Sequence, residues 1–180
     1  IFQTTSLQYL WILFLFLYFA SICAHQARQS RPLKASCAIL SRCLAAHRNL
    51  RQTEQIFLAG LLHDIGRLIM LTYCPDHARV LFHRSYRGPE SIYEAEKTVL
   101  KIQHTRIGYD LFKKWKLPQF LGQAIFYHHN PSQADEPEMA AIVHLADIIA
   151  HAAGTGSSGE HIIPYFDETA WELLKISPRV

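Results

Sequence analysis

The sequence is poor in the features that mark disulfide-rich, nucleic-acid-binding and disordered proteins. Its four cysteines form no Cys-x-x-Cys pair and are too few for a disulfide scaffold in 180 residues, so we expect reduced thiols in the core. The net charge of +3 arises from 18 Lys and Arg against 15 Asp and Glu without a basic block, and it indicates no nucleic-acid partner. With 49% apolar and 18% charged residues, a disordered chain is excluded as well.

The sequence also has no long stretch in which apolar and polar residues alternate, so nothing predicts a β-sheet. After Pro32, apolar residues recur at spacings of three and four, which predicts an all-α helical bundle. We expect Asp76 to cap a helix that ends at Gly88–Pro89. The other expected helices cover residues 34–48, 53–63, 103–116, 118–128 and 137–151, with a short last helix opening at Asp167 and polar loops at 130–136 and 154–159.

The N-terminal part is different, because residues 7–24 are almost wholly apolar and basic residues follow from Arg28 onward. About 20 apolar residues can span a bilayer, so a membrane anchor is one interpretation. A buried helix shared with a missing N-terminal half is the favoured one, and a misread N-terminus is the third. Since the chain begins with Ile1, we interpret it as a fragment, with an apolar helix over 1–31 and a helical domain over 32–180.

Eleven histidines are the unusual feature of the composition, and several of them recur beside Asp or beside one another. In the motif GLLHDIG, His63 and Asp64 end an apolar helix, and Gly66 can supply the turn that follows. Imidazole and carboxylate groups are ligands for Fe, Mn, Zn or Mg when several helices bring them together. The candidate metal ligands are His63, Asp64, His104, His128, His129 and Asp147, and His144 and His151 flank the last of these on one helical face.

Each of these residues also has a purely structural interpretation. A single inward histidine most often bonds to a backbone carbonyl group. Asp64 could cap the helix that starts near Ile65, and Asp147 could cap a neighbouring helix. The metal hypothesis therefore depends on the set of residues and not on any one of them.

Four blocks of sequence in a fixed order resemble the HDOD family, the HD-related output domains of bacterial signalling proteins. The blocks are GLLHDIGRL, KIQHTRIGYDLFKKWKLP, AIFYHH followed by Asn130-Pro131, and VHLADIIA. The order His-Asp, His, His-His, Asp is also that of the wider HD superfamily. The resemblance covers about Pro32 to Ile176 and implies an HD-like helical lobe, usually preceded by a smaller helical lobe, which favours the buried-helix interpretation of residues 7–24.

The sequence departs from the catalytic HD pattern at two places. The resemblance places Ala35 where those proteins carry a first histidine ligand, and HHNPSQADEP stands where the cyclic-di-GMP phosphodiesterases carry a Gly-Tyr-Pro signature. Arg67 keeps the positive charge of the lysine found there in many HDIG enzymes, but its fork binds phosphate differently. That phosphodiesterase activity is therefore not expected.

Three functions remain open. The family resemblance implies a noncatalytic cytoplasmic signalling module, which would bind signalling proteins, fused receiver or sensor domains, or a nucleotide. The second is a metal-dependent phosphohydrolase, with a divalent metal on the candidate ligands, Asp64 and Arg67 as its catalytic groups, and Arg67 or Lys101 near the phosphate. A protein tethered to a membrane through residues 7–24 is the third.

Overall fold

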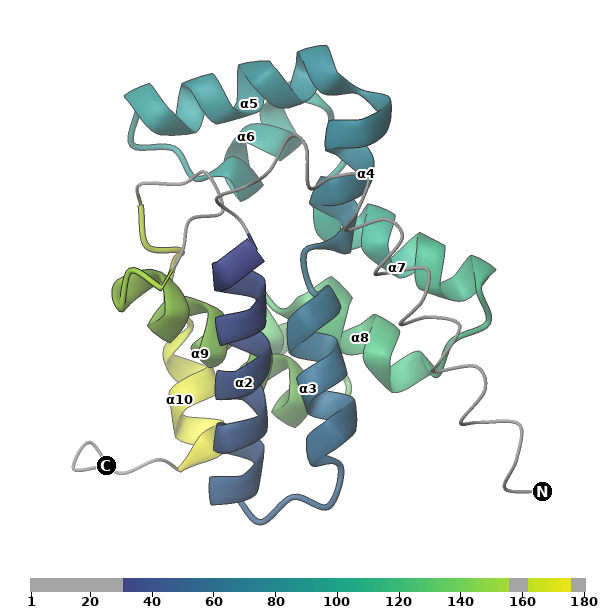
Figure 1. Ribbon diagram of the computed structural model, residues 1–180, viewed down its shortest axis with the longest axis vertical. Helices are drawn as coiled ribbons and strands as arrows, with labels where there is room; N and C mark the ends of the chain where they lie inside the picture. Colours follow the sequence, from purple (N-terminus) through teal and green to yellow (C-terminus); the bar gives the residue numbers. More distant parts are fainter. Residues whose placement is uncertain (1–30, 156–161, 176–180) are drawn as a thin grey trace.

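The protein is all-α in the part of the chain that the computed structural model describes, residues 31–155 and 162–175 (Figure 1). This confirms the fold class expected from the periodicity. The helices are α2 (Arg31–His47), α3 (Thr53–Leu62), α4 (Ile65–Tyr73), α5 (Pro75–Arg87), α6 (Ile92–Val99), α7 (His104–Lys114), α8 (Gln119–Tyr127), α9 (Pro137–Ala152) and α10 (Glu168–Leu174), with a 3-10 turn η1 (Pro131–Gln133).

The helices form two layers, and α9 is the central helix of the lower one. Helices α2, α3 and α10 pack along α9, while α4 to α6 form an upper layer that α7 and α8 join to the lower one (Figure 1). Helix α9 carries an unbroken buried stretch from Ala140 to Asp147, because neighbours cover it on several sides. The interior is apolar around Leu62, Phe112 and Ile125, so the polar residues of the candidate site lie in an otherwise apolar core.

Helices begin and end at the expected proline and glycine positions. Pro75 and Pro137 occupy the first turns of α5 and α9, and Gly88 follows the last residue of α5. The expected cap at Asp76 is wrong, because the residue before α5 is Cys74 and Asp76 lies inside the first turn. Asp167 does cap α10, accepting a hydrogen bond from the Thr169 amide.

Gly66 has a different role from the one expected. It lies inside α4, and a Cβ atom built on it would collide with the carbonyl oxygen of His104. The missing side chain therefore lets the start of α7 approach α4, and the turn itself falls at His63–Asp64.

The prediction of core cysteines holds for Cys37, which is buried, and is wrong for Cys43 and Cys74, which are exposed free thiols. Within the described ranges, Thr53–Tyr73 is long and apolar enough to cross a membrane, yet 61% of its 18-residue apolar window is buried inside the protein. Burial of this kind is typical of a core helix pair. The segment 7–24 and most of the loop 154–159 lie outside the described residues.

Candidate polar centre

Helix ends bring five of the six candidate ligands into one buried centre, and the interior of α9 supplies the sixth. His63 and Asp64 lie between α3 and α4, His104 is the first residue of α7, His128 and His129 follow α8, and Asp147 lies within α9. The first four of these residues are each at most 2% exposed. Buried charge costs free energy unless it is paired, so the contacts among these groups decide what the centre can do.

His63 directs one ring nitrogen toward the two aspartates. Its Nδ1 atom donates to the carbonyl oxygen of Gly60 at 2.7 Å. The Nε2 atom then lies 3.4 Å from Asp147 Oδ1 and 3.6 Å from Asp64 Oδ2. Although burial opposes the charged form, Cys37 and the two carboxylates raise the pKa of His63 well above its usual range. A positive charge on the ring balances the carboxylates around it.

Asp64 lies between two groups of side chains. Its Oδ2 atom faces His63 and lies 3.4 Å from Nη1 of Arg67, while Oδ1 lies 3.3 Å from His104 Nε2. The residue occupies the position before α4, but its side chain makes no capping hydrogen bond there. The capping role considered for Asp64 is therefore wrong, because the carboxylate points into the centre.

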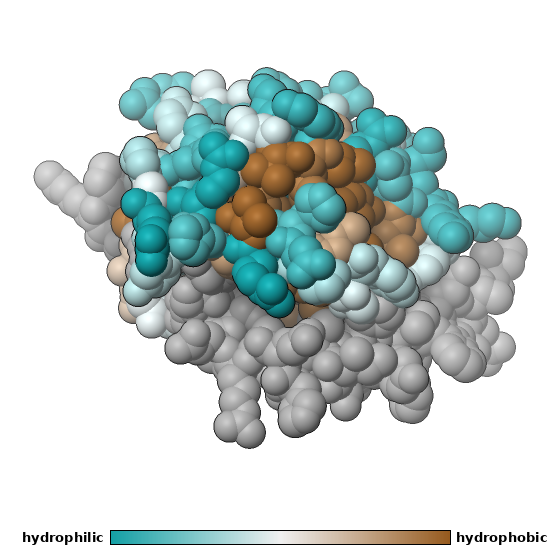
Figure 2. Space-filling model, turned by 90° about the horizontal axis from the view of Figure 1, so that it is seen from above, coloured by the Kyte–Doolittle hydropathy of each residue, from teal (hydrophilic) through white to brown (hydrophobic). Residues whose placement is uncertain are grey.

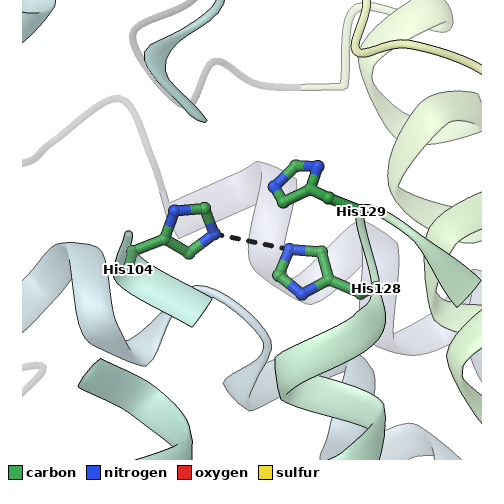
Figure 3. A group of neighbouring side chains, drawn as sticks. All are labelled: His104, His128 and His129. Atoms are coloured by element: carbon green, nitrogen blue, oxygen red, sulfur yellow. Dashed lines mark hydrogen bonds between the residues drawn. The ribbon is translucent and has the colours of Figure 1, made fainter. Parts of the chain in front are cut away.

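His104, His128 and His129 form the second group, with their rings converging from α7 and from the end of α8 (Figure 3). The Nε2 atoms of His104 and His128 lie 3.5 Å apart, and His128 Nδ1 donates to the carbonyl oxygen of Ile125. Burial and the neighbouring imidazoles lower the pKa of both His128 and His129 well below the usual value. These two rings are therefore held neutral.

Glu96 on α6 is a member of the centre that the sequence reasoning missed. Its fully buried carboxylate accepts from the His104 backbone amide at 2.8 Å and from His104 Nδ1 at 2.7 Å. Arg67 Nε lies 3.7 Å away, and despite burial the interactions with His104 and Arg67 lower the pKa of Glu96. A carboxylate on Nδ1 fixes the tautomer of His104 and aims its Nε2 atom into the centre, as in many metal sites. In the sequence, Glu96 follows Ile92 by four residues and so lies on the same helix face as that buried side chain. This spacing was the available indication that Glu96 points inward.

The two histidines that flank Asp147 have separate roles. His151 Nδ1 lies 3.3 Å from Asp147 Oδ1 and orients that carboxylate from one turn later in α9. Together with His63 it keeps the pKa of Asp147 well below its usual value, in spite of burial. Asp147 thus caps no neighbouring helix in the described structure. His144 instead links the Asp167 amide to the carbonyl oxygen of His128 and stays outside the centre.

Cys37, and not the expected position Ala35, is the residue of α2 that faces the centre. Ala35 is exposed, whereas Cys37 is fully buried with its Sγ atom beside His63 and Asp147. The ligand-type atoms of these three residues all lie within 4.8 Å of one another. The sequence reasoning missed Cys37 because it compared position 35 with the family pattern.

The geometry of the centre fits a bound cation. His63, His104 and His128 each commit Nδ1 to a carbonyl or carboxylate oxygen, which leaves their Nε2 atoms facing one another and Asp64. The separations of 3.3 to 3.6 Å match the spacing of about 3.4 Å between two ligands that each lie about 2.1 Å from a tetrahedral ion. These ring nitrogens and carboxylate oxygens are all acceptors that point into the centre. The centre therefore needs either a proton on one ring or a metal ion among them.

A cavity of about 770 Å³ reaches the edge of the centre at His129. Tyr93 stacks on the His129 ring at 4.2 Å between ring centroids, and Asn130 donates to the Tyr93 hydroxyl. Lys97 provides a positive charge in the wall. Arg67 lies inside the buried network, and Lys101 is exposed. A small anion of nucleotide size would fit this cavity.

Comparison with known proteins places the fold. The HDOD domain family matches residues 19–131. A Geobacter sulfurreducens HDOD domain protein with unknown function superposes with a TM-score of 0.71 at 19% identity, over 80% of this chain and 51% of that one. A candidate phosphohydrolase from Shewanella amazonensis gives 0.63 at 24% identity, over 72% of this chain and 48% of that one.

A candidate signal transduction protein from Marinobacter aquaeolei gives a TM-score of 0.67 at 19% identity, over 89% of this chain and 39% of that one. The chain thus spans about half the length of these solved proteins, or less. No curated protein matches the sequence. At these identities, the structural likeness establishes the shared helical fold.

Proposed function

Because the chain belongs to the HDOD family, we propose that it is a signal-transduction output module that acts by binding and not by catalysis. The observation that carries this proposal is the burial of the polar centre. A hydrolytic metal needs an open position for water and substrate. Here His63, Asp64, His104 and His128 are covered, and Arg67 is engaged with Asp64 and Glu96.

Two surfaces support a binding role. The cavity beside His129 and Tyr93 suits a small anionic ligand such as a nucleotide. On the face seen from above, an apolar area lies over the region of α5, surrounded by hydrophilic residues (Figure 2). Val80 of α5 is 48% exposed, and such areas commonly contact protein partners. We propose cytoplasmic signalling proteins, or receiver and sensor domains fused to this chain, as those partners.

A metal-dependent phosphohydrolase is the second candidate, and the spacing of the inward acceptors supports it. His63, Asp64, His104, His128 and Asp147 would hold the ion, with His129 at the side of the cavity. A bound divalent metal would supply a water of lowered pKa and polarise a phosphoryl oxygen. Glu96 would orient His104, and Lys97 lies where an anion in the cavity would meet it.

Turnover measurements distinguish the two functions. Purified protein loaded with Mn²⁺, Fe²⁺ or Zn²⁺ is assayed on nucleotides, cyclic dinucleotides and a generic phosphoester, beside Asp64→Asn and the surface control Asp110→Asn. The module predicts no turnover in any preparation. Metal-dependent turnover that is lost in Asp64→Asn and kept in Asp110→Asn would contradict the module and establish the hydrolase.

A further inference from the structure

We infer that Cys37 is a metal ligand, and that its thiolate gives the centre a preference for Zn²⁺ over Mn²⁺ and Mg²⁺. The inference goes beyond the proposed function, since it concerns the identity of the ion whether or not the domain is catalytic. It assigns a ligand from α2, from which none of the other residues of the centre described above comes.

The position of Cys37 follows from the packing of α2 against α3 and α9. The residue is 0% exposed, and its Sγ atom lies 3.9 Å from the carbonyl oxygen of Val143, one turn before Asp147 on α9. The thiol therefore reaches the centre at His63 and Asp147. Burial raises the pKa of the free Cys37 thiol, so a bound cation must displace its proton.

An independent observation points to a ligand at the same place. His63 Nε2 and Asp147 Oδ1 complete no hydrogen bond in the described part of the chain and hold only ion-pair contacts, which for Oδ1 include His151 Nδ1 at 3.3 Å, although both side chains are more than nine-tenths buried. They face each other at 3.4 Å, which is about the separation of two ligands on one tetrahedral ion. The ring is already fixed by Gly60, and the carboxylate by His151. Both groups are oriented for an ion between them.

The chemistry of the three donors sets the preference. Thiolate, imidazole and carboxylate together suit Zn²⁺, whereas Mn²⁺ and Mg²⁺ favour oxygen ligands and gain little from sulfur. The second group of the centre holds three imidazoles and no thiol. Selectivity for a thiophilic ion therefore has to come from the Cys37 side.

Two cysteines on the same helix provide a matched test. Cys37→Ser changes the buried thiol, and Cys43→Ser changes an exposed thiol on α2. Metal-free wild type and both variants are titrated anaerobically with Co²⁺ and Zn²⁺, and with Mn²⁺ in competition. Wild type and Cys43→Ser should show a near-ultraviolet thiolate-to-cobalt band. Cys37→Ser should lose this band and bind Zn²⁺ at least about 10-fold more weakly, because loss of an orienting partner alone weakens binding by that factor.

The result that overturns the inference is a folded Cys37→Ser protein that keeps the cobalt band or the wild-type preference for Zn²⁺. A second measurement covers the case in which this variant does not fold. In the triple variant Cys23→Ser, Cys43→Ser and Cys74→Ser, Cys37 is the remaining thiol, and zinc-edge absorption should show a sulfur ligand at about 2.3 Å. A shell of nitrogen and oxygen alone, or no bound zinc, overturns the inference, and neither result depends on the turnover assay.

Discussion

The two sides of the polar centre use the same residue type in opposite electrostatic settings. On one side, His63 faces Asp64, Asp147 and Cys37, and its pKa is raised. On the other side, His128 and His129 face other imidazoles, and their pKa values are lowered. All three rings are buried, so the difference comes from their neighbours and not from burial.

Asp64 connects the two sides, with one oxygen toward His63 and the other toward His104. The side around His63, here called the anionic side, holds two carboxylates and requires a cation. The side around His128 and His129, here called the imidazole side, offers lone pairs and holds little charge of its own. A motif such as His-Asp therefore says little about protonation until the residues around it are known. Variants that alter one side at a time test whether the neighbours set the protonation of each ring.

Removing the carboxylate behind the imidazole side should have the largest effect. Glu96→Gln leaves His104 Nδ1 without its buried anion and Arg67 with Asp64 alone, and breaking a buried pair from one side costs about 3 kcal/mol of unfolding free energy. Urea denaturation of the metal-free protein measures the loss. The matched control is Glu138→Gln, whose half-exposed pair with Arg48 is worth about 0.5 kcal/mol or less.

Equal losses in the two Glu→Gln variants would mean that Glu96 does not anchor His104. A further readout separates anchoring from general stability. If Glu96 aims His104 Nε2 into the centre, Glu96→Gln should weaken metal binding as well, whereas Glu138→Gln should leave it unchanged.

Gly66→Ala tests the contact that holds the two sides together. Helix propensity alone would make alanine stabilising at this position by about 0.5 to 1 kcal/mol. The added Cβ would instead meet the carbonyl oxygen of His104 and separate α4 from α7, so we expect a net loss of about 2 kcal/mol. Gly122→Ala on α8 is the control, because its Cβ meets the ring of Tyr109, which can shift. A stabilised Gly66→Ala protein would contradict the close approach.

The helices could be predicted from the sequence because their signals are local. Apolar spacing acts within one helix. The residues that mark helix starts act within a few positions of them, and these are Pro75, Pro118, Pro137 and the capping Asp167. The inward direction of His104 and Asp147 was predicted in the same way, from their steps along apolar helix faces. The role of Gly66 was not, because it depends on a neighbour that lies about 40 residues away.

Cys37 and Glu96 escaped prediction for the same physical reason. A cysteine two residues beyond the expected ligand position reaches the centre only because of the rotation of α2 against α3 and α9. Glu96 looks like one more charge on a short amphipathic helix, and only the start of α7 makes it a buried partner. Ligands that depend on how helices turn against one another leave little trace in one sequence.

His144 provides a smaller test, because it is an inward histidine outside both sides. His144→Gln keeps a polar group near Nε2 but loses the Nδ1 donor to the His128 carbonyl oxygen, which should cost about 1 kcal/mol. Metal affinity should stay at the wild-type value, in contrast to Glu96→Gln. Thermal unfolding and a zinc titration measure the two quantities. A clear loss of zinc affinity would place His144 in the centre.

We also expect a pair of opposite pH dependences in the metal-free protein. The raised pKa of His63 means that its contribution to stability is complete below pH 6.5 and is lost as the pH rises through the folded value. With lowered pKa values, His128 and His129 bind fewer protons in the folded than in the unfolded protein, so stability falls as the pH drops below 6.5. Each ring changes the unfolding free energy by at most about 1.4 kcal/mol per pH unit.

Urea midpoints measured on both sides of neutral pH, with a chelator present, separate the two contributions. His63→Asn should flatten the alkaline limb and leave the acid limb, whereas His129→Asn should flatten the acid limb and leave the alkaline one. The two carboxylates hold the proton on His63, so Asp147→Asn should lower its pKa and move the alkaline limb to lower pH. If both histidine variants change the same limb, the neighbours do not set the protonation of these rings, and the contrast between the two sides is lost.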